Sequence, residues 1–138
     1  MRKKKRAEEF VLPDHAIVPE NAYFWKTREG IVIIINRGQS IHNLEQAKAN
    51  IATVLSITDG RPELLLIDIT AIKSLSKEAR EEYAKAGDSY GVKAVAIVTN
   101  SGIGKILGNF FISFDKPVVP TKLFNSDSAA KEWLQDFL

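Results

Sequence analysis

The hydrophobic pattern predicts a β-hairpin near the start of the chain. Residues 22–26 and 31–36 are rich in aromatic and β-branched side chains and flank a short polar loop that ends at Gly30. Two such runs around a short loop are typical of paired antiparallel strands. The second run is apolar on both faces, so we expect it in the centre of a sheet. A further edge strand is expected over residues 10–18, where two prolines limit its length.

The remainder of the chain alternates between helical and strand patterns. Apolar side chains recur at helical spacing after residues that favour helix N-termini, and wholly apolar runs indicate buried strands. Helices are expected after Asn43, Ser76 and Ser126 and over residues 102–113, and strands over 64–69, 92–98 and 118–124. Pro117 and Pro120 either place the last strand at a sheet edge or make its start irregular.

This order of elements predicts an α/β fold with a mixed, mostly parallel sheet, an N-terminal hairpin and about four helices. The 138 residues, of which 45% are apolar and 26% charged, suit one globular domain. We expect that domain to span residues 9–138 and to follow a disordered basic tail over residues 1–8.

Charge is distributed unevenly. Five of the 19 basic residues lie within residues 2–6, and the other 132 residues have a net charge of −3. Such a tail can contact phosphates, but only without sequence specificity, so we expect no specific nucleic-acid partner. No apolar run approaches the length of a membrane span. The sequence therefore predicts a cytoplasmic protein without a transmembrane segment.

Several kinds of chemistry are excluded or lack their motif. The chain contains no cysteine and two histidines, so thiolate chemistry and a three-histidine metal site are ruled out. The segment 99–105 follows a strand and opens a helix but departs from both the P-loop and the dinucleotide-binding patterns. No nucleophile elbow surrounds Ser101. We therefore predict no enzyme activity, cofactor or metal.

Two groups of residues are candidate sites. The first follows the buried strand at 64–69, where ligands gather in open α/β sheets, and comprises Asp68, Thr70, Ser74, Ser76 and Lys77. Helix capping is an equally simple role for its serines. The second is the 102–113 segment and Phe114, which carry more apolar surface than one buried face holds. Its candidate partner- or ligand-contacting residues are Ile103, Ile106, Leu107, Asn109, Phe110, Phe111 and Phe114.

The strand that ends Leu-Ile-Asp-Ile-Thr and leads through a serine-bearing turn into a helix resembles the STAS fold of bacterial anti-sigma-factor antagonists, the SpoIIAA-like proteins. Residues 108–111, 116–117, 120–124 and 133–134 look like a bacterial subgroup of small SpoIIAA-like proteins without assigned function. In the antagonists, a serine in the turn is phosphorylated by a partner kinase. Counted from Asp68, Ser76 falls on the turn's aspartate and Lys77 on its first serine, so that phosphoacceptor is one residue out of register.

Three functional hypotheses remain open. The resemblance implies a non-enzymatic regulatory module that acts through contact with an unidentified protein partner and forms a homodimer, with Ser76 or Ser74 as phosphoacceptor. The second hypothesis is a carrier of an apolar small molecule or lipid, as in CRAL-TRIO domains, which related members of the wider fold resemble. The third is an enzyme that uses Asp68, Ser76 and Lys77. For this enzyme the sequence shows no general base whose surroundings would perturb its pKa.

Overall fold

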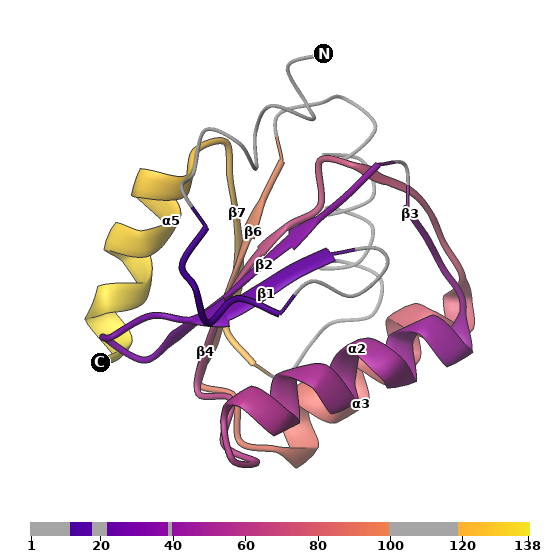
Figure 1. The fold of residues 1–138 in the computed structure, drawn as a ribbon, viewed down its shortest axis with the longest axis horizontal. Coiled ribbons are helices and arrows are strands. Elements are labelled where there is room, and N and C mark those ends of the chain that lie inside the picture. Colours follow the sequence, from indigo (N-terminus) through magenta and orange to yellow (C-terminus); the bar gives the residue numbers. More distant parts are fainter. Residues whose placement is uncertain (1–11, 18–21, 39, 100–118) are drawn as a thin grey trace.

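The computed structural model describes residues 12–17, 22–38, 40–99 and 119–138 (Figure 1). Along the chain, the elements are β1 (Ala22–Lys26), β2 (Ile31–Asn36), β3 (Ser40–His42), α2 (Leu44–Ile57), β4 (Leu64–Asp68), β5 (Ile72–Leu75), α3 (Lys77–Ser89), β6 (Ala94–Val98), β7 (Thr121–Phe124), α5 (Asp127–Leu134) and the 3-10 helix η1 (Gln135–Phe137). The helix predicted over 102–113 lies outside the described residues, as does the basic tail.

A five-stranded sheet of order β1-β2-β4-β6-β7 forms the centre of the domain. The β1–β2 pair is antiparallel, and every other neighbouring pair is parallel. The mixed, mostly parallel sheet with an N-terminal hairpin is therefore confirmed. The last strand lies at the sheet edge directly after Pro120, whose missing N–H suits that position.

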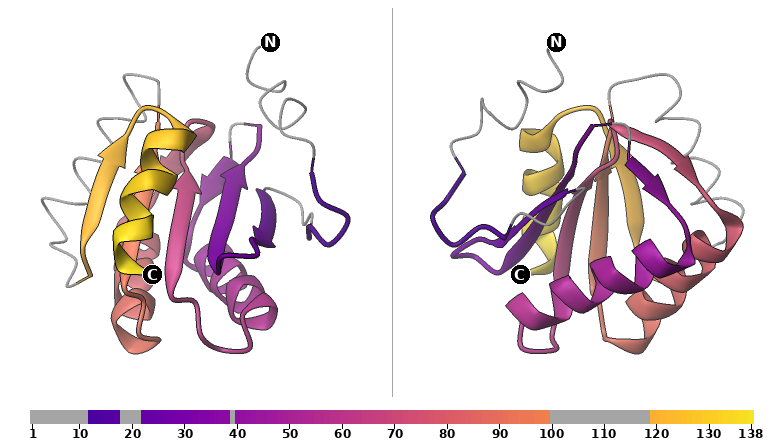
Figure 2. Two further views of the ribbon diagram at one scale, coloured as in Figure 1. Left: turned by 90° about the vertical axis from the view of Figure 1, so that its left-hand side faces the viewer. Right: turned by 45° about the vertical axis from the view of Figure 1, so that its right-hand side comes forward.

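Helices cover the sheet on both faces. Figures 1 and 2 show α5 against one face and the pair α2 and α3 against the other. All six residues of β2 are buried, as expected for a strand covered on both sides. Ile31, Ile33 and Ile35 belong to the core cluster with α5, whereas Val32 and Ile34 pack with Val54 of α2.

The N-caps of the helices follow the prediction. The side-chain oxygen of Asn43 accepts a hydrogen bond from the N–H of Gln46, at 2.8 Å. Ser76 accepts one from Ala79 at 3.0 Å, and Ser126 accepts one from the third residue after it, at 3.2 Å. Each cap satisfies a backbone donor that the first helical turn leaves free.

The edge strand expected over residues 10–18 is reduced to a single bridge in the part that the structure describes. Residues 12–16 are not extended as a strand, and the N–H of Ala16 turns back to donate to the carbonyl of Pro13 at 3.1 Å. Ile17 alone pairs with Phe24 of β1. The turn after Pro13 prevents these residues from running alongside β1.

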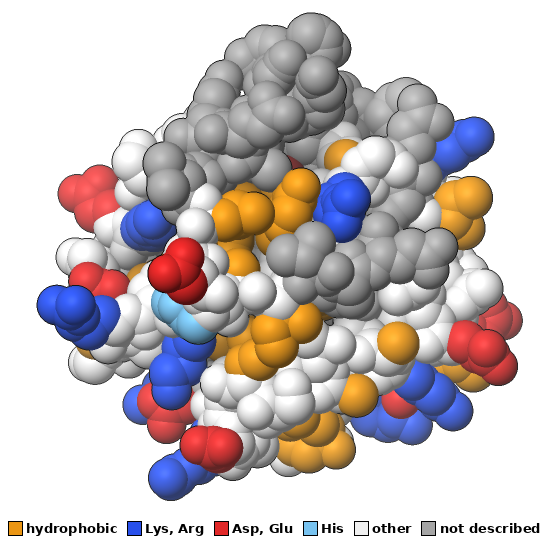
Figure 3. All heavy atoms as spheres, in the orientation of Figure 1, with side chains coloured by type: hydrophobic (Ala, Val, Ile, Leu, Met, Phe, Trp, Pro, Cys, Tyr) orange, Lys and Arg blue, Asp and Glu red, His pale blue; other side chains and the backbone are white. Residues whose placement is uncertain are grey.

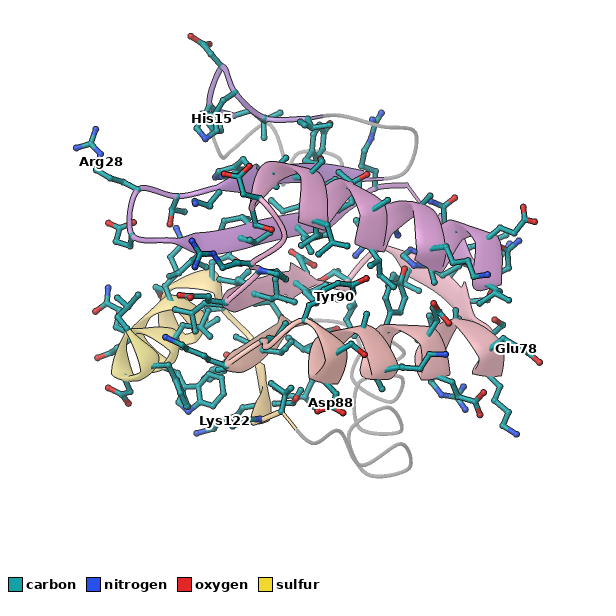
Figure 4. All side chains as sticks on the ribbon, turned by 90° about the horizontal axis from the view of Figure 1, so that it is seen from below. His15, Arg28, Glu78, Asp88, Tyr90 and Lys122 are labelled. Carbon is teal, nitrogen blue, oxygen red and sulfur yellow. The ribbon has the colours of Figure 1, made fainter. Side chains whose placement is uncertain are left out.

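A second, two-stranded parallel sheet was not predicted. It pairs β3 with β5, and each strand ends directly before a helix cap. The N–H of Ser76 donates to the carbonyl of His42 at 3.0 Å, which joins the two strand ends. This small sheet aligns the starts of α2 and α3, and the helices run side by side (Figures 1 and 4).

No helix within the described ranges is long and apolar enough to cross a membrane.

Candidate functional site: an apolar cavity with a buried histidine

The two faces of the sheet are filled to different degrees. On the middle strand β4, Leu64, Leu66 and Asp68 are buried on the α5 side, whereas Leu65 and Ile67 are only partly buried on the other. A central parallel strand is normally covered on both faces. The helix pair α2–α3 therefore leaves space over the middle of the sheet.

That space is a cavity of about 160 Å³. Apolar side chains from both layers form most of its wall. The sheet contributes Phe24, Ile34, Leu65, Ile67, Val95 and Ile97, and the helices contribute Ile51, Val54, Leu55, Ala84, Ala86 and Gly87. None of the described residues that line it is Asp, Glu, Lys or Arg.

The small side chains of α3 explain why the space remains. Ala84, Ala86 and Gly87 face the cavity and cannot span the distance to the sheet. Tyr90, at the end of this helix, lines the cavity and is 45% exposed, and Figure 4 places it between α2 and α3. The cavity therefore reaches the surface at Tyr90. On the side seen in Figure 3, charged side chains lie mostly around the periphery and apolar ones surface near the middle.

A hydrogen-bonded group of three polar side chains forms part of the cavity wall. Nδ1 of His42 lies 2.6 Å from the hydroxyl oxygen of Tyr83, and the side-chain amide of Asn50 donates to that oxygen at 2.9 Å. Gln46 in turn donates to the side-chain oxygen of Asn50 at 3.2 Å. The group thus joins β3, α2 and α3 at one end of the cavity.

Burial sets the protonation of this group. It lowers the pKa of His42 to about 4, because the charged imidazolium loses its hydration. Burial likewise raises the pKa of Tyr83 to about 12, although the hydrogen bond from Asn50 lowers it in part. At neutral pH the imidazole is therefore neutral and the phenol keeps its proton.

The hydrogen bonds of Tyr83 bear on the tautomer of His42. Asn50 donates to the Tyr83 oxygen, which leaves the phenolic hydrogen available for donation to Nδ1 of His42. With Nδ1 as the acceptor, a neutral imidazole carries its single hydrogen on the other nitrogen, Nε2. That atom is buried and has no hydrogen-bond partner in the structure.

A second polar atom without a partner belongs to Asn36, at the end of β2. Its amide nitrogen donates to the carbonyl of Asp68 at 2.9 Å, but its side-chain oxygen is buried and makes no hydrogen bond. Asn36 and His42 are 6% and 3% exposed, and both line the cavity. Buried polar atoms nearly always have partners, so both atoms call for a ligand or ordered water.

The chemistry of these groups favours binding over catalysis. A general acid or base works best with a pKa near the working pH, and His42 and Tyr83 lie far below and far above neutrality. Within the described ranges, no cluster of three His, Asp or Glu side chains is placed to hold a metal ion. That the protein is not an enzyme stays a prediction.

The turn residues predicted as a site lie on several consecutive elements. Asp68 is buried at the end of β4, where its Oδ1 accepts from the N–H of Thr70 at 2.8 Å. Ser74 lies exposed on β5, beyond Thr70. Ser76 caps α3, and the exposed Lys77 pairs with Glu81 of the same helix at 3.7 Å. The intervening strand β5 separates the capping serine from the strand-end aspartate.

The predicted apolar contact residues between 103 and 114 lie outside the described residues. Sequence reasoning did not identify the group formed by His42, Asn50 and Tyr83. One signal was available, since Asn50 occupies a position on the apolar face of α2 between Ala47 and Val54. A polar residue on such a face needs a buried partner.

A family comparison matches this architecture. The model of a domain of unknown function, DUF7793, matches residues 24–138. The chain belongs to this family. The match covers β2 to β7, all of β1 but its first two residues, all three described α-helices and every described residue that lines the cavity. No curated protein matches this DUF7793 chain.

One solved structure similar to this DUF7793 chain is an uncharacterised protein of the DUF3478 family from Shewanella loihica PV-4, which has a SpoIIAA-like fold. The two are 22% identical with a TM-score of 0.57, and the match covers 82% of this chain and 91% of the other. The resemblance to SpoIIAA-like proteins is therefore confirmed at the level of the fold.

Proposed function

We propose that this domain binds a small apolar molecule in the cavity between the sheet and the helices α2 and α3. The cavity volume of about 160 Å³ is the observation that carries the proposal. Engineered apolar cavities of about 150 Å³ bind benzene, whereas pockets for drug-sized ligands start near 300 Å³. The expected cargo is therefore the size of one ring or a short chain, which is smaller than a typical lipid.

The carrier hypothesis also agrees with the chemistry of the wall. An apolar ligand gains about 25 cal/mol for each Å² of apolar surface removed from water. Ile67 of β4 and Val54 of α2 offer such surface from opposite sides of the cavity. Neither a charged substrate nor a metal ion has a counter-charge among the described lining residues.

Native mass spectrometry of the protein purified from its own host tests the proposal. We expect a mass excess that disappears on denaturation, because the cargo is held without a covalent bond. Ala86→Leu, which places a larger side chain in the cavity, should lose the excess. Ala52→Leu, on the exposed face of α2, should retain it. A native mass equal to the denatured mass, together with no binding of added toluene, would contradict the proposal.

A second candidate is the protein-interaction module. Ile41 on β3 is 58% exposed and lies in register with the exposed Ser74 on β5. An exposed isoleucine beside a serine suits a contact surface that phosphorylation regulates. This candidate predicts a dimer in the native spectrum and a phosphoryl increment on Ser74 or Ser76 in the denatured mass. A monomer without the increment would argue against it.

A further inference from the structure

The unpaired polar atoms in the cavity wall indicate which chemical groups a bound molecule would carry. Nε2 of His42 is buried and has no partner, and His42 lines the cavity. With Nδ1 accepting from Tyr83, Nε2–H is an unpaired hydrogen-bond donor. An apolar hydrocarbon would leave this donor unpaired, which is costly in a dry site. A ligand with an acceptor atom at this position would satisfy it.

The wall also restricts the charge of the ligand. None of the described lining residues is an acid or a base other than His42, Tyr83 and Tyr90, and burial keeps His42 neutral. The unpaired side-chain oxygen of Asn36 adds a partial negative charge to the same wall. A carboxylate or phosphate would therefore lose its hydration without gaining a counter-charge.

We propose that the cargo is an uncharged, ring-sized molecule whose single oxygen accepts a hydrogen bond from Nε2–H of His42, as a ketone, alcohol or phenol does. The inference rests on the proposed function and adds the class of ligand. Tyr83 acts as a positioning residue, because its hydroxyl hydrogen holds Nδ1 as the acceptor and so keeps the hydrogen on Nε2.

Cyclohexanone, toluene and cyclohexanecarboxylate are suitable probes, since they are similar in size and differ in polarity and charge. Binding can be followed by NMR of isoleucine methyl groups in the intact protein. The cavity isoleucines include Ile34, Ile51, Ile67, Ile69, Ile72 and Ile97. Ile31, Ile33 and Ile35, on the α5 face of the sheet, serve as internal controls.

We expect cyclohexanone and toluene to shift the cavity methyls and to leave the controls unchanged. In His42→Leu, the affinity for cyclohexanone relative to toluene should fall about tenfold, because a buried oxygen then has no donor. His42→Gln, which keeps an amide donor near the position of Nε2, should retain most of that preference.

A second measurement avoids any dependence on the folding of the variants. In protein labelled with ¹⁵N-histidine, His42 should show the Nε2–H tautomer. Its proton resonance should move downfield with cyclohexanone and remain in place with toluene. An Nδ1–H tautomer, or no response to cyclohexanone, would overturn the inference.

The remaining outcomes separate the two proposals. Binding of toluene but not of cyclohexanone would refute the inference and leave the apolar carrier standing. Tighter binding of cyclohexanecarboxylate than of cyclohexanone would also refute it, since the ligand would then be an anion. If none of the three probes shifts a cavity methyl, the proposed function fails as well.

Discussion

The hydroxyl oxygen of Tyr83 lies 2.6 Å from Nδ1 of His42, although 41 residues separate the two along the chain. This contact joins the end of β3 to the middle of α3, and Asn50 of α2 completes it from the second helix. Three separate segments thus meet at one buried polar point beside an otherwise apolar cavity. The contact stabilises the helix pair and also orients the histidine.

Replacement of Tyr83 tests how much its hydrogen bonds with His42 and Asn50 contribute to stability. Tyr83→Phe should lower the free energy of unfolding by about 1–3 kcal/mol, because Nδ1 of His42 and the amide of Asn50 both lose their partner. Urea denaturation measures the change. Tyr90→Phe is the matched control, since Tyr90 is 45% exposed, and its effect should stay within about 0.5 kcal/mol. Equal effects of the two changes would show that the buried contact contributes little.

The buried histidine predicts a specific dependence of stability on pH. The pKa of His42 is about 4 in the folded protein against 6.5 when unperturbed, so the unfolded chain binds the proton first as the pH falls. His42 thus leaves stability unchanged above about pH 6.5 and lowers it between pH 6.5 and 4, in total by on the order of 3 kcal/mol. Denaturation curves across this range measure the loss.

His42→Gln should remove this component of the pH dependence, whereas His15→Gln should leave it in place, because His15 is exposed. Parallel pH curves for the wild-type protein and His42→Gln would show that His42 is not held neutral by burial. Affinity for a neutral cavity ligand should fall only as the pH approaches the folded-state pKa of about 4, since protonation then places a charge in an apolar wall.

Gly87 lies within α3 and faces the cavity, so a methyl group at this position is expected to stabilise the protein. An added Cβ would approach Val119 at 3.8 Å, an ordinary contact, and alanine favours a helix over glycine by about 0.5–1 kcal/mol. Gly87→Ala should therefore raise the unfolding free energy, as measured by thermal or urea denaturation.

Gly91 provides the contrast for this change. Its φ of +72° lies in the left-handed region, so Gly91→Ala should destabilise the domain by about 1 kcal/mol. A loss of stability in Gly87→Ala would mean that the space above α3 is already filled.

The opposite face of the sheet should affect stability without affecting the cavity. Leu134 of α5 is fully buried, and Leu134→Ala should cost about 2–5 kcal/mol. Leu138 is 64% exposed, so Leu138→Ala should change little. In the folded fraction, Leu134→Ala should bind toluene like the wild-type protein, as calorimetry would measure. A large loss of affinity would show that the two faces are coupled.

Local patterns determined much of the fold. The period of apolar residues separates strands from helices, and Asn43, Ser76 and Ser126 cap the helices because each supplies an oxygen to a donor three residues on. Residues 31–36 form a central strand because both of their faces are apolar. These features depend on neighbours in sequence, so one chain suffices to predict them.

The strands β3 and β5 could not be predicted from local sequence patterns. They have three and four residues, include polar positions and form only because the chain returns to pair Ile41 with Ser74. Their pairing places the strand β5 between Asp68 at the end of β4 and the capping Ser76. Strand pairs of this length carry no pattern of their own.

The sequence by itself determined which residues are apolar, where the helices begin and which strands are buried, because these follow from side-chain chemistry and local hydrogen bonding. Only the tertiary structure decided that small side chains on α3 would stand over Leu65 and Ile67 and leave a cavity. It also decided that His42, Asn50 and Tyr83 would meet there. Cavities and polar contacts of this kind depend on the spacing between packed layers, which no single segment of the chain specifies.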